Sequence, residues 1–155
     1  MAKIKRKSRY CRICYFKLIQ KMKNQAEIRK ILEYKSIAVV GFSPKEERPS
    51  NYVSMYMQKN GYFITPVNPS HQHIGNLKCY PSLESIDHPI DIVNIFRRSE
   101  FVYDIVKSSI FINAKAVWMQ DSVYDKRAER LAIGKDILVV MDDCILRQHK
   151  ILKEK

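Results

Sequence analysis

The sequence has no long hydrophobic run and few cysteines. Among its 155 residues the uninterrupted apolar stretches reach only four or five residues, as at 37–40, so we expect no membrane-spanning segment. Basic residues interrupt the N-terminus throughout, which excludes the apolar core of a secretory signal. Four cysteines without dense, regular spacing indicate reduced thiols rather than a disulfide framework. We therefore expect one soluble cytoplasmic domain, with organellar import as the alternative if the basic N-terminus is a transit peptide.

Acidic residues are absent from residues 1–26, and this makes the charge distribution uneven. Residues 1–35 carry 12 Lys and Arg against 2 Asp and Glu, whereas residues 36–155 carry 16 against 14. The net charge of +12 therefore belongs mainly to an N-terminal arm, and the remainder of the chain is almost neutral. We divide the sequence into a basic leader, residues 1–23, and a folded domain, residues 24–155.

The leader allows several interpretations. Its cations suit the phosphates of a nucleic acid. Cys11, Tyr15, Leu18 and Met22 have helical spacing, so the leader could also form an amphipathic helix on an anionic membrane surface. Cys11 and Cys14 have zinc-knuckle spacing, but no second pair or nearby His completes a site, so we predict no metal there. A leader that is weakly ordered, or that packs on the domain as a helix, remains open.

From residue 36 onward, short apolar runs alternate with helical patterns. The runs cover residues 37–41, 62–67, 91–96, 116–119 and 137–141, and each is typical of a strand buried on both faces of a parallel sheet. Residues 50–60 end in a helix stop signal, and residues 102–110 and 123–132 keep helical spacing of apolar side chains. Pro66 is tolerable only near the end or edge of a sheet. The pattern predicts an α/β fold, a Rossmann-like doubly wound sheet of about five mainly parallel strands with helices on both faces.

Doubly wound folds bind ligands outside the carboxyl ends of their strands, so the residues after each run are the candidates for a site. After the first run, Gly41 permits a tight turn. Ser43 and Ser50 offer hydroxyls, and Arg48 lies beside the start of the next helix. Free helix N–H groups together with a guanidinium suit a phosphate, so we predict that this loop holds one.

The second and third runs are followed by further polar and aromatic groups. Asn68 can offer its amide to a base or phosphate, and Pro69 fixes the turn. Phe96 can stack on a planar base, while Arg97 and Arg98 indicate that an anion binds at this point.

The fourth run ends in Met119, which can line an apolar slot, and Gln120, which can hydrogen-bond a ligand amide. The loop after the first run is not G-x-G-x-x-G, and no Asp or Glu occurs between Gly61 and Leu83, where NAD-binding folds usually carry one. His71 and His73 form an isolated pair, for which we predict no metal. The ligand we expect is phosphorylated and nucleotide-like, but it is neither NAD nor FAD.

These segments resemble the small stand-alone CoA-binding proteins, which are related to the CoA-binding domain of the succinyl-CoA synthetase alpha subunit. The similarity runs through about three-quarters of the chain, in the stretches 38–44, 47–50, 61–62, 66–69, 78–83, 91–93, 96–100, 116–120 and 140–144. The resemblance implies a Rossmann-type domain that binds CoA or a short acyl-CoA across the strand ends. By position, the resemblance implies that the pyrophosphate of CoA binds to Gly41, Ser43, Arg48 and Ser50, and that the nucleotide binds beside Asn68 and Pro69. It further implies that Phe96, Arg97 and Arg98 flank the nucleotide and its phosphates. Met119 and Gln120 would contact the pantetheine arm. Asp143 departs from this pattern, since we expect a basic residue there, and it could reduce affinity for an anionic ligand.

The sequence offers little for catalysis. It contains no nucleophile elbow and no recognisable Ser-His-Asp arrangement, and Asp142 and Asp143 are too close in sequence to act as facing carboxylates. Cys144 is the one candidate, since we predict it at a helix N-terminus, where the dipole favours thiolate and a mixed disulfide with the CoA thiol could form. The leading prediction is a CoA-binding protein without catalysis of its own. The alternatives are an enzyme acting on an acyl-CoA through Cys144 or a partner subunit, and a nucleic-acid or membrane-surface protein acting through its leader.

Overall fold

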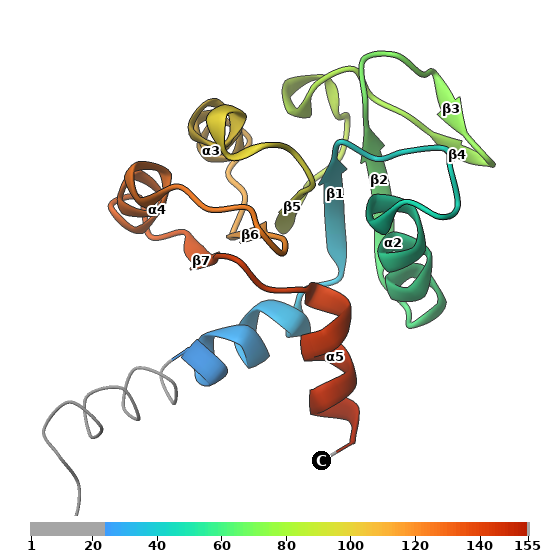
Figure 1. The fold of residues 1–155 in the computed structure, drawn as a ribbon. Coiled ribbons are helices and arrows are strands. Elements are labelled where there is room, and N and C mark those ends of the chain that lie inside the picture. The colour runs from blue at the N-terminus through green and yellow to red at the C-terminus, as the bar shows by residue number, and fades with distance from the viewer. Residues whose placement is uncertain (1–23, 155) are drawn as a thin grey trace, which may run out of the picture.

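The computed structural model describes residues 24–154 (Figure 1). The predictions made for the leader, including the Cys11 and Cys14 pair and the apolar stripe, lie outside these residues. The division at residue 23 therefore stays a prediction.

The sheet contains five parallel strands in the order β2-β1-β5-β6-β7. These are β1 (Ser36–Val40), β2 (Phe63–Val67), β5 (Ile92–Ile95), β6 (Ala116–Met119) and β7 (Leu138–Val140). All four strand pairings are parallel, and every residue of β5 and β6 is buried. The predicted doubly wound α/β fold is confirmed, and each strand lies within the apolar run that predicted it, to within one residue.

Pro66 occupies the position that its chemistry requires. It lies in β2, which is the outermost strand on its side of the sheet, opposite Val39 of β1. Its carbonyl faces outward and accepts the N–H of Tyr80 at 2.9 Å. A proline at this position removes no hydrogen bond from the sheet, because its missing N–H would also point outward.

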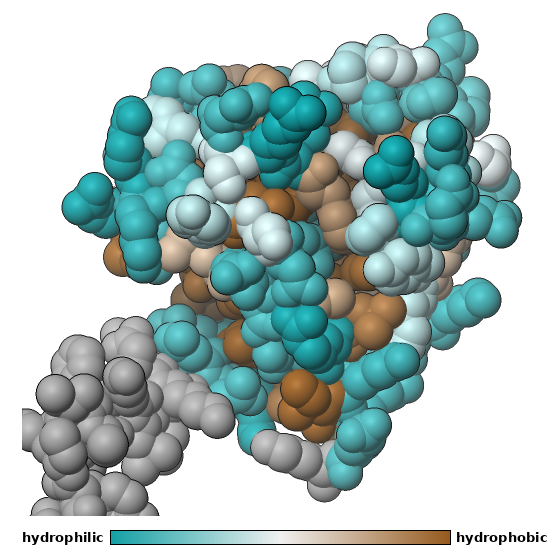
Figure 2. Space-filling model, viewed as in Figure 1, coloured by the Kyte–Doolittle hydropathy of each residue, from teal (hydrophilic) through white to brown (hydrophobic). Residues whose placement is uncertain are grey.

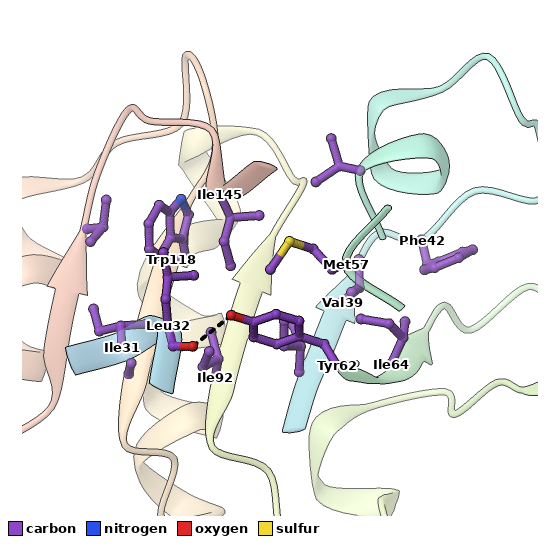
Figure 3. Packing of buried hydrophobic residues seen from close by; sticks show 14 of the residues in the cluster. Ile31, Leu32, Val39, Phe42, Met57, Tyr62, Ile64, Ile92, Trp118 and Ile145 are labelled. Atoms are coloured by element: carbon purple, nitrogen blue, oxygen red, sulfur yellow. Dashed lines mark hydrogen bonds between the residues drawn. The ribbon is translucent and has the colours of Figure 1, made fainter. Parts of the chain in front are cut away.

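One face of the sheet is covered by α2 (Pro49–Lys59), α5 (Ile145–Lys153) and a helix over residues 24–33. Ile31, Met57 and Ile145 from these helices pack on alternate strand residues in a cluster of buried side chains (Figure 3). The Tyr62 hydroxyl donates a hydrogen bond of 2.7 Å to the Leu32 carbonyl and thereby ties the 24–33 helix to the end of α2. Burial explains why these helices stay in place, since each contributes apolar side chains that water would otherwise contact.

The opposite face is covered by α3 (Val102–Phe111) and α4 (Lys126–Ile133). Val106 and Ala128 pack there on the strand residues that alternate with those of the first cluster, such as Ala38 and Val93. Shorter elements complete the chain: the antiparallel hairpin β3 (His73–Ile74) and β4 (Leu77–Lys78), and the 3-10 turns η1 (Leu83–Ser85) and η2 (Ser99–Phe101). The two helical layers are the predicted arrangement, whereas the hairpin was not predicted.

No helix within residues 24–154 is long and apolar enough to cross a bilayer. On the face drawn in Figure 2, hydrophobic residues appear as separate patches among hydrophilic ones. Most of the buried apolar side chains in this part of the chain belong to the two clusters on either face of the sheet.

Candidate functional site

A cleft of about 630 Å³ opens at the carboxyl ends of β1, β5 and β6. From β1 the chain continues outward to β2 at one edge of the sheet, whereas from β5 it continues through β6 to β7 at the other edge. The connections that leave β1 and β5 therefore run in opposite directions across the sheet. Such a switch point leaves a crevice, and in open α/β sheets ligands bind in it. The lining consists of Gly41, Ser43, Lys45, Arg48, Pro49, Ser50, Tyr52, Val53, Phe96, Arg97, Arg98, Gln120, Asp121, Ser122, Val123 and Cys144.

Gly41 makes the narrow turn that leads from β1 into the cleft. Its φ is +87°, a conformation that side chains with a Cβ rarely adopt. A Cβ placed there would also lie 2.7 Å from the carbonyl oxygen of Phe96 and 3.0 Å from Cδ of Arg97. Glycine therefore allows the loops after β1 and β5 to approach each other.

The loop that follows Gly41 is held by its own hydrogen bonds. The Ser50 hydroxyl accepts the Ser43 N–H at 3.0 Å, and the Asn51 amide donates to the Ser43 carbonyl at 2.9 Å. Ser50 is buried inside the first turn of α2, and Arg48 is the residue that precedes this helix. The predicted serines thus shape the loop, which presents the start of α2 to the cleft.

Four cationic side chains line the cleft near β1 and β5: Lys45, Arg48, Arg97 and Arg98. All four are exposed. Arg98 lies 3.9 Å from Glu100 in an exposed pair, and among residues 24–154 neither Arg48 nor Arg97 has an ion-pair partner. The Arg97 guanidinium lies 4.8 Å from the centre of the Phe101 ring, which helps to hold it without neutralising it. This end of the cleft is positively charged and suited to phosphate groups.

Gln120 is positioned by a buried partner. Its Nε2 donates a hydrogen bond of 2.7 Å to Oδ1 of Asn94, and both side chains are almost fully buried. Asn94 lies in the central strand β5. This contact orients the Gln120 amide at the edge of the cleft. Sequence reasoning missed Asn94, although a polar residue within an apolar strand was a usable signal.

Two further lining residues, Asp121 and Cys144, follow β6 and β7. Cys144 precedes the first residue of α5, as predicted, is half-buried, and donates its backbone N–H to the Asp143 carboxylate at 2.8 Å. The Arg147 guanidinium bonds Asp121 through both terminal nitrogens, at 2.7 and 3.1 Å, and reaches Asp143 at 2.6 Å. Asp143, where the sequence pattern favoured a cation, therefore accepts the N–H of Cys144 ahead of α5 and pairs with Arg147.

Three predicted residues do not line the cleft. Met119 is fully buried in the cluster beneath α3 and α4. Asn68 donates its amide to the Phe42 carbonyl at 2.9 Å and accepts the Ser70 N–H, so its side chain joins the loops after β1 and β2. Pro69 is exposed beside it. The other eight predicted binding residues, Gly41, Ser43, Arg48, Ser50, Phe96, Arg97, Arg98 and Gln120, all line the cleft.

The cleft also contains residues that the sequence did not single out. Lys45 adds a fourth cation, and Tyr52, half exposed on the first turns of α2, adds an aromatic surface. His71 and His73 lie in and near the β3 hairpin. Within residues 24–154 no three His, Cys, Asp or Glu side chains are grouped so that they could hold a metal ion.

The model of the CoA binding domain family matches residues 35–150, which include every strand of the sheet and the whole cleft. The chain belongs to this family. The positively charged cleft at the switch point therefore lies within the part of the chain that the CoA binding domain model matches.

Two of the similar proteins cover more than four-fifths of this chain, and a third covers a shorter part of it. The Bacillus subtilis (strain 168) protein YneT is 40% identical over 131 residues, covering 84% of this chain and 97% of the relative. A solved structure of a hypothetical protein from Pyrococcus horikoshii OT3 is 35% identical with a TM-score of 0.80, covering 83% of this chain and 92% of that one. The ADP-forming acetate–CoA ligase II of Archaeoglobus fulgidus is 27% identical over 106 residues, which cover 67% of this chain but only 16% of the ligase.

Proposed function

We propose that this protein binds CoA, or a short acyl-CoA, in the cleft after β1, β5 and β6, without catalysis of its own. The observation that carries the proposal is the set of four cations at a switch-point cleft, in a chain that matches the CoA-binding family. CoA carries a diphosphate and a ribose 3′-phosphate, which together call for several cationic partners. Neither Arg48 nor Arg97 has an acidic partner among the described residues, so both guanidinium groups are available.

The charges orient the ligand within the cleft. The phosphates lie against Arg48, Arg97 and Arg98 and the start of α2, because this is the positively charged end. The pantetheine arm then runs past Gln120, whose amide matches the amides of the arm. The thiol points toward Cys144, which lines the cleft after β7. Asn68 and Pro69 support the loop beside the nucleotide, and Met119 acts as core beneath Gln120.

Calorimetric titration with CoA tests this assignment. Arg48→Ala and Arg97→Ala should each weaken CoA binding by roughly ten- to a hundred-fold, the range for a charge-assisted hydrogen bond. Arg130→Ala is the matched control, because Arg130 is an exposed cation on α4 that does not line the cleft. Dephospho-CoA should bind more weakly than CoA to the wild-type protein. Arg98→Ala should reduce the ratio of the two dissociation constants. Absence of CoA binding in ligand-free wild-type protein would refute the proposal, and so would cleft variants that bind as the control does.

A second candidate rests on the position of Cys144 in the lining of the cleft. Its thiol and the thiol of bound CoA could form a mixed disulfide, with an added oxidant such as diamide accepting the two electrons and two protons. Intact-mass measurement after diamide treatment should then show one CoA adduct that peptide mapping places on Cys144 and that Cys144→Ser removes. Cys79 is buried away from the cleft and serves as the internal control. An adduct that persists in Cys144→Ser would exclude this role.

A further inference from the structure

A second cavity lies along β7, the outermost strand on its side of the sheet. This groove has a volume of about 970 Å³ and shares no lining residue with the cleft at the switch point. The helix over residues 24–33 borders the groove from one face of the sheet and α4 borders it from the other, with strand residues 137–141 between them (Figure 1). The groove therefore follows an edge of the sheet that two helices flank.

The edge of β7 exposes backbone groups and apolar surface to this groove. Within residues 24–154, β6 is the only strand that pairs with β7. Leu138 donates its N–H to the Lys115 carbonyl at 3.0 Å, on the β6 side, so the N–H and carbonyl of the next residue, Val139, point to the groove. The Ile133 side chain, 59% exposed on α4, adds apolar surface beside them. Proteins commonly cover such an edge with a helix or loop, because it can otherwise pair with another chain.

Acidic side chains outnumber basic ones in the lining of the groove. The carboxylates are those of Glu27, Glu129, Asp136 and Asp143, and the cations are Lys30 and Lys126. Glu129 already pairs with Lys126 at 3.3 Å, and Asp143 already pairs with a cation of α5. Among residues 24–154, neither Glu27 nor Asp136 has an ion-pair partner. The groove therefore suits a segment that is apolar on one side and cationic on the other.

The basic leader, residues 1–23, has this composition and joins the domain at the groove. It contains nine Lys and Arg and no acidic residue, and it is followed directly by Asn24, which lines the groove. The apolar stripe named above runs over residues 11–22 of the leader. A helix of that length would span about 18 Å, close to the roughly 15 Å of the helix over residues 24–33 that borders the groove.

We propose that the leader docks in the groove along β7, with its apolar stripe against Ile133 and the strand edge and its cations beside Glu27 and Asp136. Docking covers the open edge of the sheet with a segment of the same chain and prevents β7 from pairing with a second copy. It also occupies the residues that nucleic-acid or membrane binding through the leader would need, so the groove competes with such ligands for the leader.

Disulfide trapping in the full-length protein tests the docking. Ile133→Cys places a thiol in the groove, where a docked leader brings Cys11 or Cys14 near it. Phe111→Cys is the matched control, because Phe111 is 71% exposed on α3 and lies outside the groove. After oxidation with diamide, peptide mapping should find roughly ten-fold more of the link to Cys11 or Cys14 in Ile133→Cys than in Phe111→Cys, since docking raises the local concentration of the leader thiols at the groove.

The contribution of charge can be measured in the same Ile133→Cys protein. Added Asp136→Asn should lower the yield of the link, and so should high salt, because the ion pairs are partly solvated. Added Asp104→Asn should leave the yield unchanged, because Asp104 pairs with Lys107 on α3, outside the groove.

Three results would overturn the proposal. Equal yields of the link in Ile133→Cys and Phe111→Cys would show that the leader does not prefer the groove. A link that joins two chains rather than one, seen as a product of twice the mass, would assign the groove to a second copy. A yield that neither salt nor Asp136→Asn changes would remove the role of the carboxylates.

Discussion

Gly41 offers the sharpest test of how the cleft is built. Its substitution by Ala adds one methyl group at φ +87°, 2.7 Å from the Phe96 carbonyl oxygen. The unfavourable backbone conformation costs about 1–2 kcal/mol. The contact adds about 1–3 kcal/mol, because the neighbouring atom is backbone at the end of a buried central strand and cannot move freely.

Gly61 is the matched control. It has the same φ of +87°, but a Cβ there would meet nothing within 4 Å. It ends α2 with the paired hydrogen bonds of a Schellman motif, from Gly61 N–H to Gln58 and from Tyr62 N–H to Met57. Gly61→Ala therefore reports the backbone cost alone, and the difference between the two variants reports the close approach of the two cleft loops.

Both variants can be compared by thermal melting and CoA titration. We expect the melting temperature to fall by roughly 3–6 °C for Gly61→Ala and by roughly 6–15 °C for Gly41→Ala. Only Gly41→Ala should also weaken CoA binding, because it displaces Phe96 and Arg97. Equal destabilisation in the two variants, or unchanged CoA affinity in Gly41→Ala, would refute the reasoning.

Three further measurements follow from the buried polar groups. Asn94→Ala leaves the Gln120 amide without its acceptor and should lower the free energy of unfolding by about 1–3 kcal/mol in urea titrations; an unchanged value would contradict the buried bond. Burial raises the pKa of Tyr62 from 10.0 to about 12, so the stability that its neutral hydroxyl contributes should be complete below pH 10 and be lost as the pH rises toward 12. In urea titrations at alkaline pH, Tyr62→Phe should lose less of its free energy of unfolding over this range than the wild-type protein does. The lone tryptophan, Trp118, is fully buried and donates to the Asp143 carbonyl at 2.7 Å, so its fluorescence should be blue-shifted and resist iodide; strong quenching would contradict this placement.

Much of the site was predictable because it follows from the strand ends. Each strand was a short apolar run, and the polar residues directly after the first, third and fourth runs do line one cleft. Asp121 and Asp143 were not predictable as a unit, because Arg147 joins them from a later helix. The β3–β4 hairpin was also missed, since strands of two residues leave no periodic pattern.

Met119 shows that the sequence pattern alone cannot decide which residue at the end of a strand reaches the cleft. Successive residues of a strand point to opposite faces of the sheet, so Trp118 packs beneath α5 and Met119 beneath α3 and α4. The sequence showed that both end the same buried strand. It could not show that both side chains would lie in the core and that only the next residue, Gln120, would reach the cleft, because that depends on where the strand stops relative to its neighbours.

The amino-acid sequence by itself determined the alternation of buried strands and amphipathic helices, and hence the doubly wound sheet, because burial on both faces requires uninterrupted local apolar runs. It also determined which loops carry cations. Only the tertiary structure decided that β1 lies beside β5, which brings Gly41 against Phe96, and that Arg147 joins Asp121, which lines the cleft, to Asp143. Such contacts join residues distant in sequence, so their geometry exists only once the strands are paired and the helices packed.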